Sequence, residues 1–265
     1  MIDLDALLQP IAPDNPCGPD LRGVSGDPTL AKANDLRQEL DAELDPSGRG
    51  KSADWAGLVK LCAEALTSRS KDLQLAAYLA EGLARTQGFP GLIAGLRLAR
   101  ELVERHWDGL HPGREDGEIV LPVRARWLTW LGGSGDFLAS VKRIPLTAAL
   151  GERAHCWFDF EQSKRVDEAS RKSDTQRRDE LLSAGLITGE QWRQALRATP
   201  PAALGATVAA IDEALAEVAA LKSLGDERFG DDAPLFVELD NLLVDCRDHL
   251  RRAQAAEGGL DEGAA

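Results

Sequence analysis

The stretch with the clearest chemical potential is DPSGRGKS at residues 45–52, which ends in Gly50-Lys51-Ser52. These three residues form the end of a phosphate-binding loop, in which backbone amides and a lysine surround the phosphates of a nucleotide. The complete motif needs a glycine where this chain has Asp45, and it follows a strand, whereas the preceding RQELDAEL is typical of a helix. Because a carboxylate at position 45 would repel phosphate, we interpret the stretch as an interhelical loop, with Ser52 as the N-cap of the next helix.

The segment ERHWDGLH contains three side chains that could bind a metal, namely His106, Asp108 and His111. Zinc-binding histidines on one helix are four residues apart, as in HExxH, because that spacing places them on the same face. His106 and His111 are five residues apart, and Pro112 marks the end of the helix. We therefore interpret His106 as a histidine near a helix C-terminus, where the helix dipole favours its protonated form.

Nucleophile and thiol chemistry are also poorly supported. The segment LGGSGD (131–136) resembles the nucleophile elbow GxSxG, but Asp136 replaces the final glycine and no strand precedes it. The cysteines are far apart and form no CxxC pair, which is typical of free thiols in a reducing compartment: Cys17, Cys62, Cys156 and Cys246. The sequence therefore predicts a protein that is not an enzyme and has no cofactor-binding or metal-binding residues.

The charge of the chain limits its partners. It has 265 residues, of which 43% are hydrophobic and 28% charged, and its formal net charge is −13. An acidic chain repels phosphate backbones, so we expect no nucleic-acid partner. The start of the chain has Asp3 and Asp5 where a signal peptide would be basic, and no run approaches the roughly 18 apolar residues of a membrane span. We expect a cytoplasmic protein without direct membrane insertion.

Apolar residues recur at helical spacing nearly everywhere, and alternating strand patterns are almost absent. This pattern predicts an all-α fold, a multi-helix bundle that ends in an antiparallel helical hairpin. Expected helices cover about 27–44, 52–66, 71–87, 89–110, 117–132, 136–143 and 188–197, and two long ones begin near 200 and 232. We predict a helical body at 1–150, a polar connector with short helices at 151–199, the hairpin at 200–256 and a disordered tail at 257–265.

Three large apolar side chains give more specific expectations. Trp107 closes an apolar stripe over 92–107, and we expect it to be mostly buried against the preceding helix. Leu235 and Leu242 are seven residues apart beside the main stripe of the last helix, which makes them candidates for partner binding or weak self-association.

Several segments together resemble the N-terminal (ImpA_N) domain of the TssA/ImpA family of bacterial type VI secretion proteins. They are LLQPIAPDNPCGPDLR (7–22), DWAGLVKLCAEAL (54–66), the long block at 70–112, KRIPLT (142–147) and DDAPLFVELDNLL (231–243). The resemblance spans about residues 7–250, and its most specific part is the block at 70–112. Matching positions whose roles look structural are Pro16, Cys17, Gly18, Asp72, Gly88, Trp107 and Pro112.

The resemblance implies a non-catalytic scaffold that helps to assemble a contractile injection machine. The implied partners are other secretion subunits, namely the baseplate, sheath, tube and membrane complex. Family members usually continue into a C-terminal domain that forms rings, so we expect this chain to be either a fragment or a short member. Residues 29–50 fit the family poorly, in agreement with a variable loop at 45–52.

Two other functions stay open. One is a generic cytoplasmic helical adaptor outside secretion, which a different gene neighbourhood would indicate. The other is a nucleotide-binding enzyme that uses Gly50-Lys51-Ser52, which a nucleotide titration would test.

Overall fold

The computed structural model describes residues 2–39, 50–149, 151 and 153–261, with the side chains placed as far as residue 255. Within these ranges the chain is overwhelmingly helical, as predicted, and its one sheet is the short antiparallel pair β1 (Arg114–Glu115) and β2 (Glu118–Ile119). The helices are α1 (Leu4–Leu8), α2 (Thr29–Arg37), α3 (Trp55–Ser68), α4 (Leu73–Gln87), α5 (Phe89–His106), α6 (Leu121–Gly133), α7 (Gly135–Lys142), α8 (Trp157–Arg171), α9 (Thr175–Ser183), α10 (Gly189–Ala198), α11 (Pro201–Phe229) and α12 (Val237–Asp261).

Most helix ends follow from local sequence signals. Thr188 and Gln191 form a capping box at the start of α10, and the C-cap of α4 is Gly88, whose φ of 66° lies in the left-handed region that glycine adopts readily. Ser52 was the wrong cap: the Asp54 side chain accepts a hydrogen bond of 2.8 Å from the amide of Gly57, so α3 begins at Trp55. A carboxylate in this position also interacts favourably with the helix dipole.

The second helix is shorter than the sequence suggested. α2 ends at Arg37, and residues 40–49, which include most of DPSGRGKS, lie outside the described residues. Pro28 carries no capping side chain, but the carboxylate of Asp27 accepts from the amide of Thr29 at 2.8 Å and so satisfies one free donor of the first turn.

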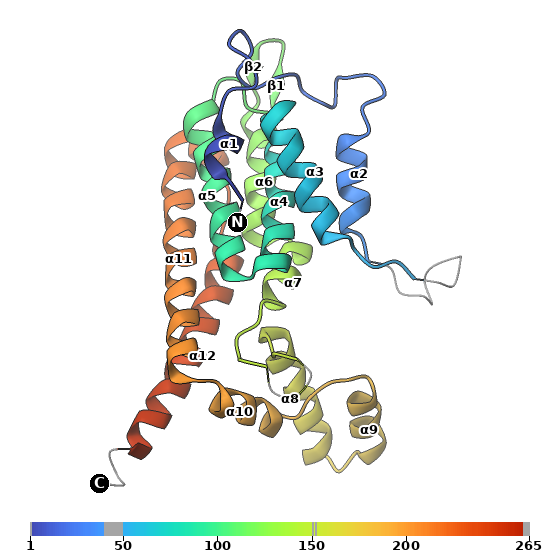
Figure 1. Cartoon of the computed structure of the whole chain (residues 1–265), viewed down its shortest axis with the longest axis vertical. Helices are drawn as coiled ribbons and strands as arrows, with labels where there is room; N and C mark the ends of the chain where they lie inside the picture. The colour runs from blue at the N-terminus through green and yellow to red at the C-terminus, as the bar shows by residue number, and fades with distance from the viewer. Residues whose placement is uncertain (1, 40–49, 150, 152, 262–265) are drawn as a thin grey trace.

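The core of the body is centred on α4 and α5, and the helices packed against one or both of them are α1, α2, α3, α6, α7 and α11. α4 is buried over most of its length because it packs against α3, α5, α6 and α7. Figure 1 shows α11 lying along α5, with α12 beside it and the β1–β2 turn at the upper end of the molecule. Apolar side chains from the predicted body, connector and hairpin join one core, from Leu7 through Trp192 to Leu250.

The C-terminal hairpin is present, with corrected boundaries. α11 and α12 are antiparallel and turn through a short 3₁₀ segment, Gly230–Asp232. α12 begins at Val237 and continues to Asp261, so the first part of the predicted tail at 257–265 is helical, and residues 262–265 lie outside the described ranges. The inward stripe of α12 is as predicted, since Leu239, Leu243 and Cys246 are buried.

The segment predicted as a polar connector contains α8, α9 and α10. Figure 1 places these helices at the end of the molecule opposite the β1–β2 turn. A small separate cluster of Val166, Ala169 and Leu181 joins α8 to α9. In the described part of the chain, none of the helices is both long and apolar enough to cross a membrane.

Candidate functional site

The lysine of the partial phosphate loop is engaged in a surface ion pair. Lys51 Nζ lies 2.5 Å from a carboxylate oxygen of Asp35 and 2.6 Å from the Asp35 carbonyl oxygen. Gly50 has a φ of 69°, and the helix that follows is capped by Asp54. The described end of the loop therefore differs from a phosphate cradle in two respects: its lysine pairs with an acid, and a carboxylate caps the N-terminus of the following helix.

The two histidines of ERHWDGLH point to different backbone carbonyls. His106 Nε2 donates to the carbonyl oxygen of Leu8 at 2.9 Å, and His111 Nε2 donates to that of Gly18 at 3.0 Å. His106 is the last residue of α5, as predicted, but burial lowers its pKa, so the neutral form is favoured instead of the protonated one. Among the described residues no group of His, Cys, Asp and Glu side chains has the arrangement of a metal site.

The remaining motifs also have structural roles. Ser134 lies between the end of α6 and the start of α7, and its backbone is extended. Asp136 forms an ion pair with Arg37 at 3.1 Å. All four cysteines are free and buried. Burial raises the pKa of the Cys17, Cys62, Cys156 and Cys246 thiols, which disfavours the reactive thiolate.

The Pro-Cys-Gly loop is the centre of a polar junction between α1, α3, α4, α5 and α6. The Cys17 carbonyl accepts from the Lys71 amide at 2.8 Å, and the Lys71 carbonyl accepts from the His111 amide at 3.0 Å. Gly18 has a φ of 67° and packs so closely on Arg69 that a Cβ would overlap the Arg69 carbonyl oxygen. The junction, as we use the term below, comprises Cys17, Gly18, Lys71, His106, His111 and Arg124.

Two cations are fully buried in this junction. Lys71 Nζ donates to the carbonyl oxygens of Leu7 and Leu66, each at 2.6 Å, and burial lowers its pKa to about 8. The Arg124 guanidinium donates to three carbonyls in the segment that follows α5, including that of Leu110 at 2.6 Å, and burial lowers its pKa to about 10. Both cations satisfy backbone carbonyls at or just beyond helix ends, which would otherwise lack these hydrogen bonds.

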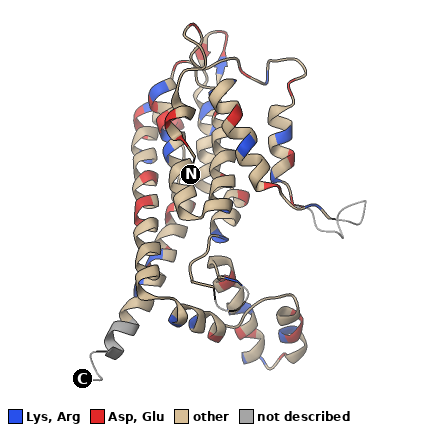
Figure 2. Ribbon diagram, in the orientation of Figure 1, with Lys and Arg blue, Asp and Glu red and all other residues tan. Residues whose placement is uncertain are grey.

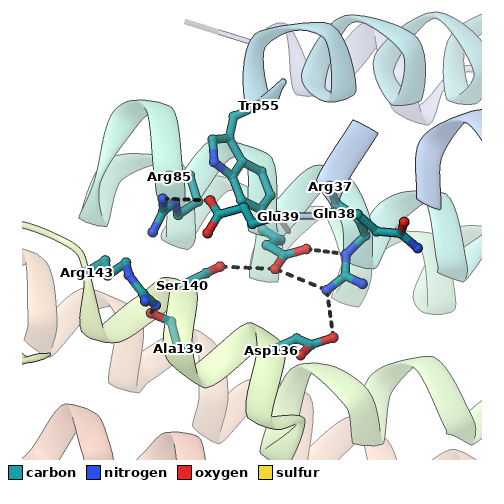
Figure 3. Close-up of a pocket in the computed structure, with 10 residues that line it drawn as sticks. Arg37, Gln38, Glu39, Trp55, Arg85, Asp136, Ala139, Ser140 and Arg143 are labelled. Carbon is teal, nitrogen blue, oxygen red and sulfur yellow. Dashed lines mark hydrogen bonds and ion pairs between the residues drawn. The ribbon is translucent and has the colours of Figure 1, made fainter. Parts of the chain in front are cut away.

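A cavity of about 250 Å³ lies between α2, α4 and α7 (Figure 3). At its base Glu81 is 1% exposed and receives hydrogen bonds from Arg37 Nε at 2.7 Å and from Ser140 Oγ at 3.0 Å. Burial raises the pKa of Glu81, although Arg37 and Ser140 act in the opposite direction. Arg85 lies further along the cavity and pairs with Glu39 at 3.4 Å.

The chemistry open to this cavity is limited because its polar groups are already paired. The Glu81 carboxylate is shared by Arg37 and Ser140, and neither serine nor glutamate has a histidine beside it to move a proton. Arg37 also lies over the rings of Tyr78 and Trp130 at about 5 Å. The arrangement connects α2, α4 and α7 through one buried ion pair and the hydrogen bond from Ser140. These contacts indicate a structural role and not a reaction centre.

The structure separates the two leucines proposed as partner contacts. Leu242 is 7% exposed and packs in the core, so it is unavailable to a partner and that interpretation was wrong. Leu235 is 68% exposed and precedes α12, next to Val237 at 55%. The backbone of Leu235 passes so close to α6 that only a glycine fits at Gly132.

Trp107 is half-buried, and its main neighbour differs from the expected one. Its ring makes an edge-to-face contact with Phe229 of α11, with 5.0 Å between centroids, and Arg124 lies over the ring at 4.9 Å. The tryptophan therefore links the junction to the hairpin.

Comparison with known proteins places this architecture among secretion components. The family described as "ImpA, N-terminal, type VI secretion system" matches residues 8–133. The type VI secretion system component TssA1 of Pseudomonas aeruginosa is 36% identical over 115 residues, and the match covers 42% of this chain but only 32% of TssA1. A solved N-terminal domain of the TssA component from Burkholderia cenocepacia, which includes the ImpA_N region, superposes with a TM-score of 0.81 at 29% identity, over 97% of this chain and 96% of that one.

Proposed function

We propose that the chain, which matches the ImpA_N family of type VI secretion proteins over residues 8–133, is a non-catalytic assembly component of a type VI secretion system. In this role it contacts the baseplate and the tail tube or sheath in the cytoplasm while the machine is built. The chain matches about a third of the length of the curated relative, so the contacts of a complete protein are part of the proposal.

The observation that carries the proposal is the end-to-end structural likeness to a TssA N-terminal domain. The match includes α8 to α12, which lie beyond the family region at 8–133, and therefore covers the hairpin as well as the body. A fold alone does not define a function, but a sequence identity of 29% over nearly the whole chain supports a shared role more strongly than topology would.

The chemistry of the interior favours a scaffold over an enzyme. The buried charged groups of the body face backbone carbonyls or one another: Lys71 and Arg124 bind carbonyls, and Glu81 binds Arg37. Groups held in this way stabilise a defined shape, which a protein needs when it presents fixed surfaces to several partners.

The test is a deletion of the gene in its host, complemented by the wild-type chain. We expect loss of fluorescently labelled sheath structures and of effector secretion, and recovery of baseplate or sheath subunits when the tagged chain is purified from cells. A deletion strain that assembles sheaths and secretes normally would instead support an adaptor outside secretion.

Self-association is a further part of the proposed role, with Leu235 as its remaining candidate contact. Leu235 and Val237 are exposed large apolar side chains two residues apart at the start of α12, which is where a weak contact between copies would gain most from burial. Sedimentation of the Leu235→Asp variant should show less dimer than the wild-type chain, whereas unchanged sedimentation would remove Leu235 from consideration.

A further inference from the structure

A groove of about 570 Å³ lies between α8, α10 and α12, at the opposite end of the molecule from the junction. Its floor is aromatic. The ring centroids of Phe160 and Trp192 are 5.4 Å apart, and those of Phe160 and His249 are 4.3 Å apart. Aromatic surfaces with one polar handle are typical of protein-binding sites, because they contribute a large apolar area with little conformational freedom to lose.

The floor is held in place before any ligand arrives. Trp192 is 2% exposed, and its indole N–H donates to His249 Nε2 at 3.0 Å. Because His249 accepts this hydrogen bond, its imidazole is neutral, and burial together with the nearby Arg252 and Lys164 lowers its pKa. Trp157 also packs against this cluster, in an edge-to-face contact with His249 whose ring centroids are 5.8 Å apart.

The rim of the groove is basic. Four cations line it, on all three helices: Lys164, Arg193, Arg197 and Arg252. Figure 2 shows the basic positions of α10 in this part of the molecule. Glu190 pairs with Arg193 at 2.9 Å and with Arg197 at 2.7 Å, and Asp167 lines the groove but uses one carboxylate oxygen to accept from the Gly189 amide.

Lys164 lies on α8 and Arg252 on α12. They differ from Arg193 and Arg197, which both pair with Glu190. Lys164 Nζ lies 4.3 Å above the centre of the Phe160 ring, and the structure gives neither Lys164 nor Arg252 an ion pair within residues whose side chains it places. A basic rim on a chain of net charge −13 is a local reversal of sign, which attracts acidic partners specifically to this surface.

We propose that this groove binds an acidic segment of a partner protein, which places an aromatic side chain on the floor of Phe160, Trp192 and His249 and its carboxylates against Lys164 and Arg252. The proposal rests on the assembly role above and specifies the chemistry of one partner surface. The volume is within the roughly 300–1,000 Å³ range of ligand pockets, enough for one large side chain and its neighbours. A flat lipid surface would reach the rim but leave the recessed aromatic floor empty.

The test uses the whole purified chain and a fluorescent peptide of glutamates around one central tryptophan. Matched peptides replace the glutamates with lysine or the tryptophan with alanine. We expect saturable binding of the first peptide, measured by anisotropy, and at least about tenfold weaker binding of both matched peptides, because each loses one half of the recognition. Equal binding of the lysine peptide, or no binding of the first peptide, would overturn the proposal.

Two variants of the chain locate the binding. Lys164→Glu with Arg252→Glu should weaken the glutamate–tryptophan peptide at least tenfold, and Ala253→Trp should do so by filling the groove without changing its charge. The control, Arg165→Glu with Arg171→Glu, makes the same charge change on α8 at exposed residues that do not line the groove, and should leave affinity within about threefold. Equal loss in the control pair would contradict the groove as the site.

Two further readouts separate this proposal from its alternatives. Vesicles rich in phosphatidylglycerol should not compete with the peptide, and competition that disappears in the Lys164→Glu/Arg252→Glu variant would identify a membrane ligand instead. A deletion strain that secretes normally while the peptide binds as expected would refute the assembly role and leave the groove intact. Normal co-purification of secretion subunits with a chain that binds no peptide would refute the groove alone.

Discussion

Two ion pairs of similar length show how the body and the α8–α10 region differ. Arg37 Nε lies 2.7 Å from Glu81, and Arg153 Nη1 lies 2.8 Å from Asp159. The Arg37 side chain is 11% exposed, whereas the Arg153 side chain is 50% exposed. Burial raises the pKa of Glu81, while for Asp159 hydrogen bonds from Arg153 and Cys156 outweigh burial and lower the pKa.

The same pair chemistry therefore has different consequences in the two places. In the body the Arg37–Glu81 pair lies buried between three helices. If one partner is removed, water has little access to solvate the charge of the other. At the start of α8 the pair is a helix cap that solvent can partly compensate. The comparison indicates a body whose ion pairs fix its shape and a second region whose paired arginine is accessible to solvent.

The largest expected effect comes from Glu81. Glu81→Ala should lower the free energy of unfolding by about 3–5 kcal/mol, because the buried Arg37 keeps only the exposed carboxylate of Asp136 as its ion-pair partner. Asp159→Ala should cost only about 1–2 kcal/mol, the usual cost of losing a cap. Urea denaturation followed by circular dichroism measures both. The double change Arg37→Met with Glu81→Met should be milder than Glu81→Ala, and equal losses at Glu81 and Asp159 would remove the distinction between the regions.

Trp107 tests the connection between the body and the hairpin. Full burial would predict a loss of about 3–5 kcal/mol for Trp107→Ala, but the half-buried ring on Phe229 leads us to expect about 2 kcal/mol. Trp107→Phe should recover at least half of that loss because an aromatic contact is kept. A thermal melt within a degree of the wild type for Trp107→Ala would show that the contact with α11 contributes nothing.

A smaller effect should appear in mild acid, in both regions. Burial lowers the pKa of His106 in the junction and of His249 in the groove floor, so below the unfolded-state pKa of about 6.5 the unfolded chain binds more protons than the folded one. The associated stability is complete above about pH 6.5 and is lost as pH falls towards the folded pKa. We expect Tm to fall by about 3 °C between pH 7 and pH 5.5.

His249→Phe and His106→Gln divide this effect between the two regions. Each variant should show a shallower fall in Tm with acidification than the wild type. Calorimetry in buffers of equal ionic strength measures the slopes, and slopes that stay unchanged in both variants would assign the acid sensitivity to other groups.

The smallest effect is expected at Lys51. Lys51→Ala removes an ion pair to Asp35, whose side chain is 70% exposed, so stability should change by no more than about 0.5 kcal/mol. Binding of the glutamate–tryptophan peptide should also be unchanged, since Lys51 is far from the groove along the chain and absent from its lining. ATP or GTP binding that this substitution abolishes would revive the nucleotide-binding alternative.

The sequence by itself determined the helices, because helix formation leaves a local record. The apolar spacing predicted the all-α class and the inward stripe of α12, and the capping box at Thr188 and the glycine at Gly88 marked helix ends correctly. The segments of the family resemblance were also recognisable from residues alone, and the comparisons confirm them over residues 8–133. Local signals failed where two caps competed, as with Ser52 and Asp54.

Only the tertiary structure decided which charges are buried and which apolar residues are exposed. Lys71, Glu81 and Arg124 look like ordinary surface residues in the sequence, since nothing within one helix shows that a carbonyl or an arginine from a distant segment will meet them. For the same reason, Leu242 was predicted to lie on the exposed face of the last helix, whereas it is buried. The groove depends on Phe160, Trp192 and His249 meeting from three helices up to 89 residues apart, a distance in sequence over which periodicity carries no information.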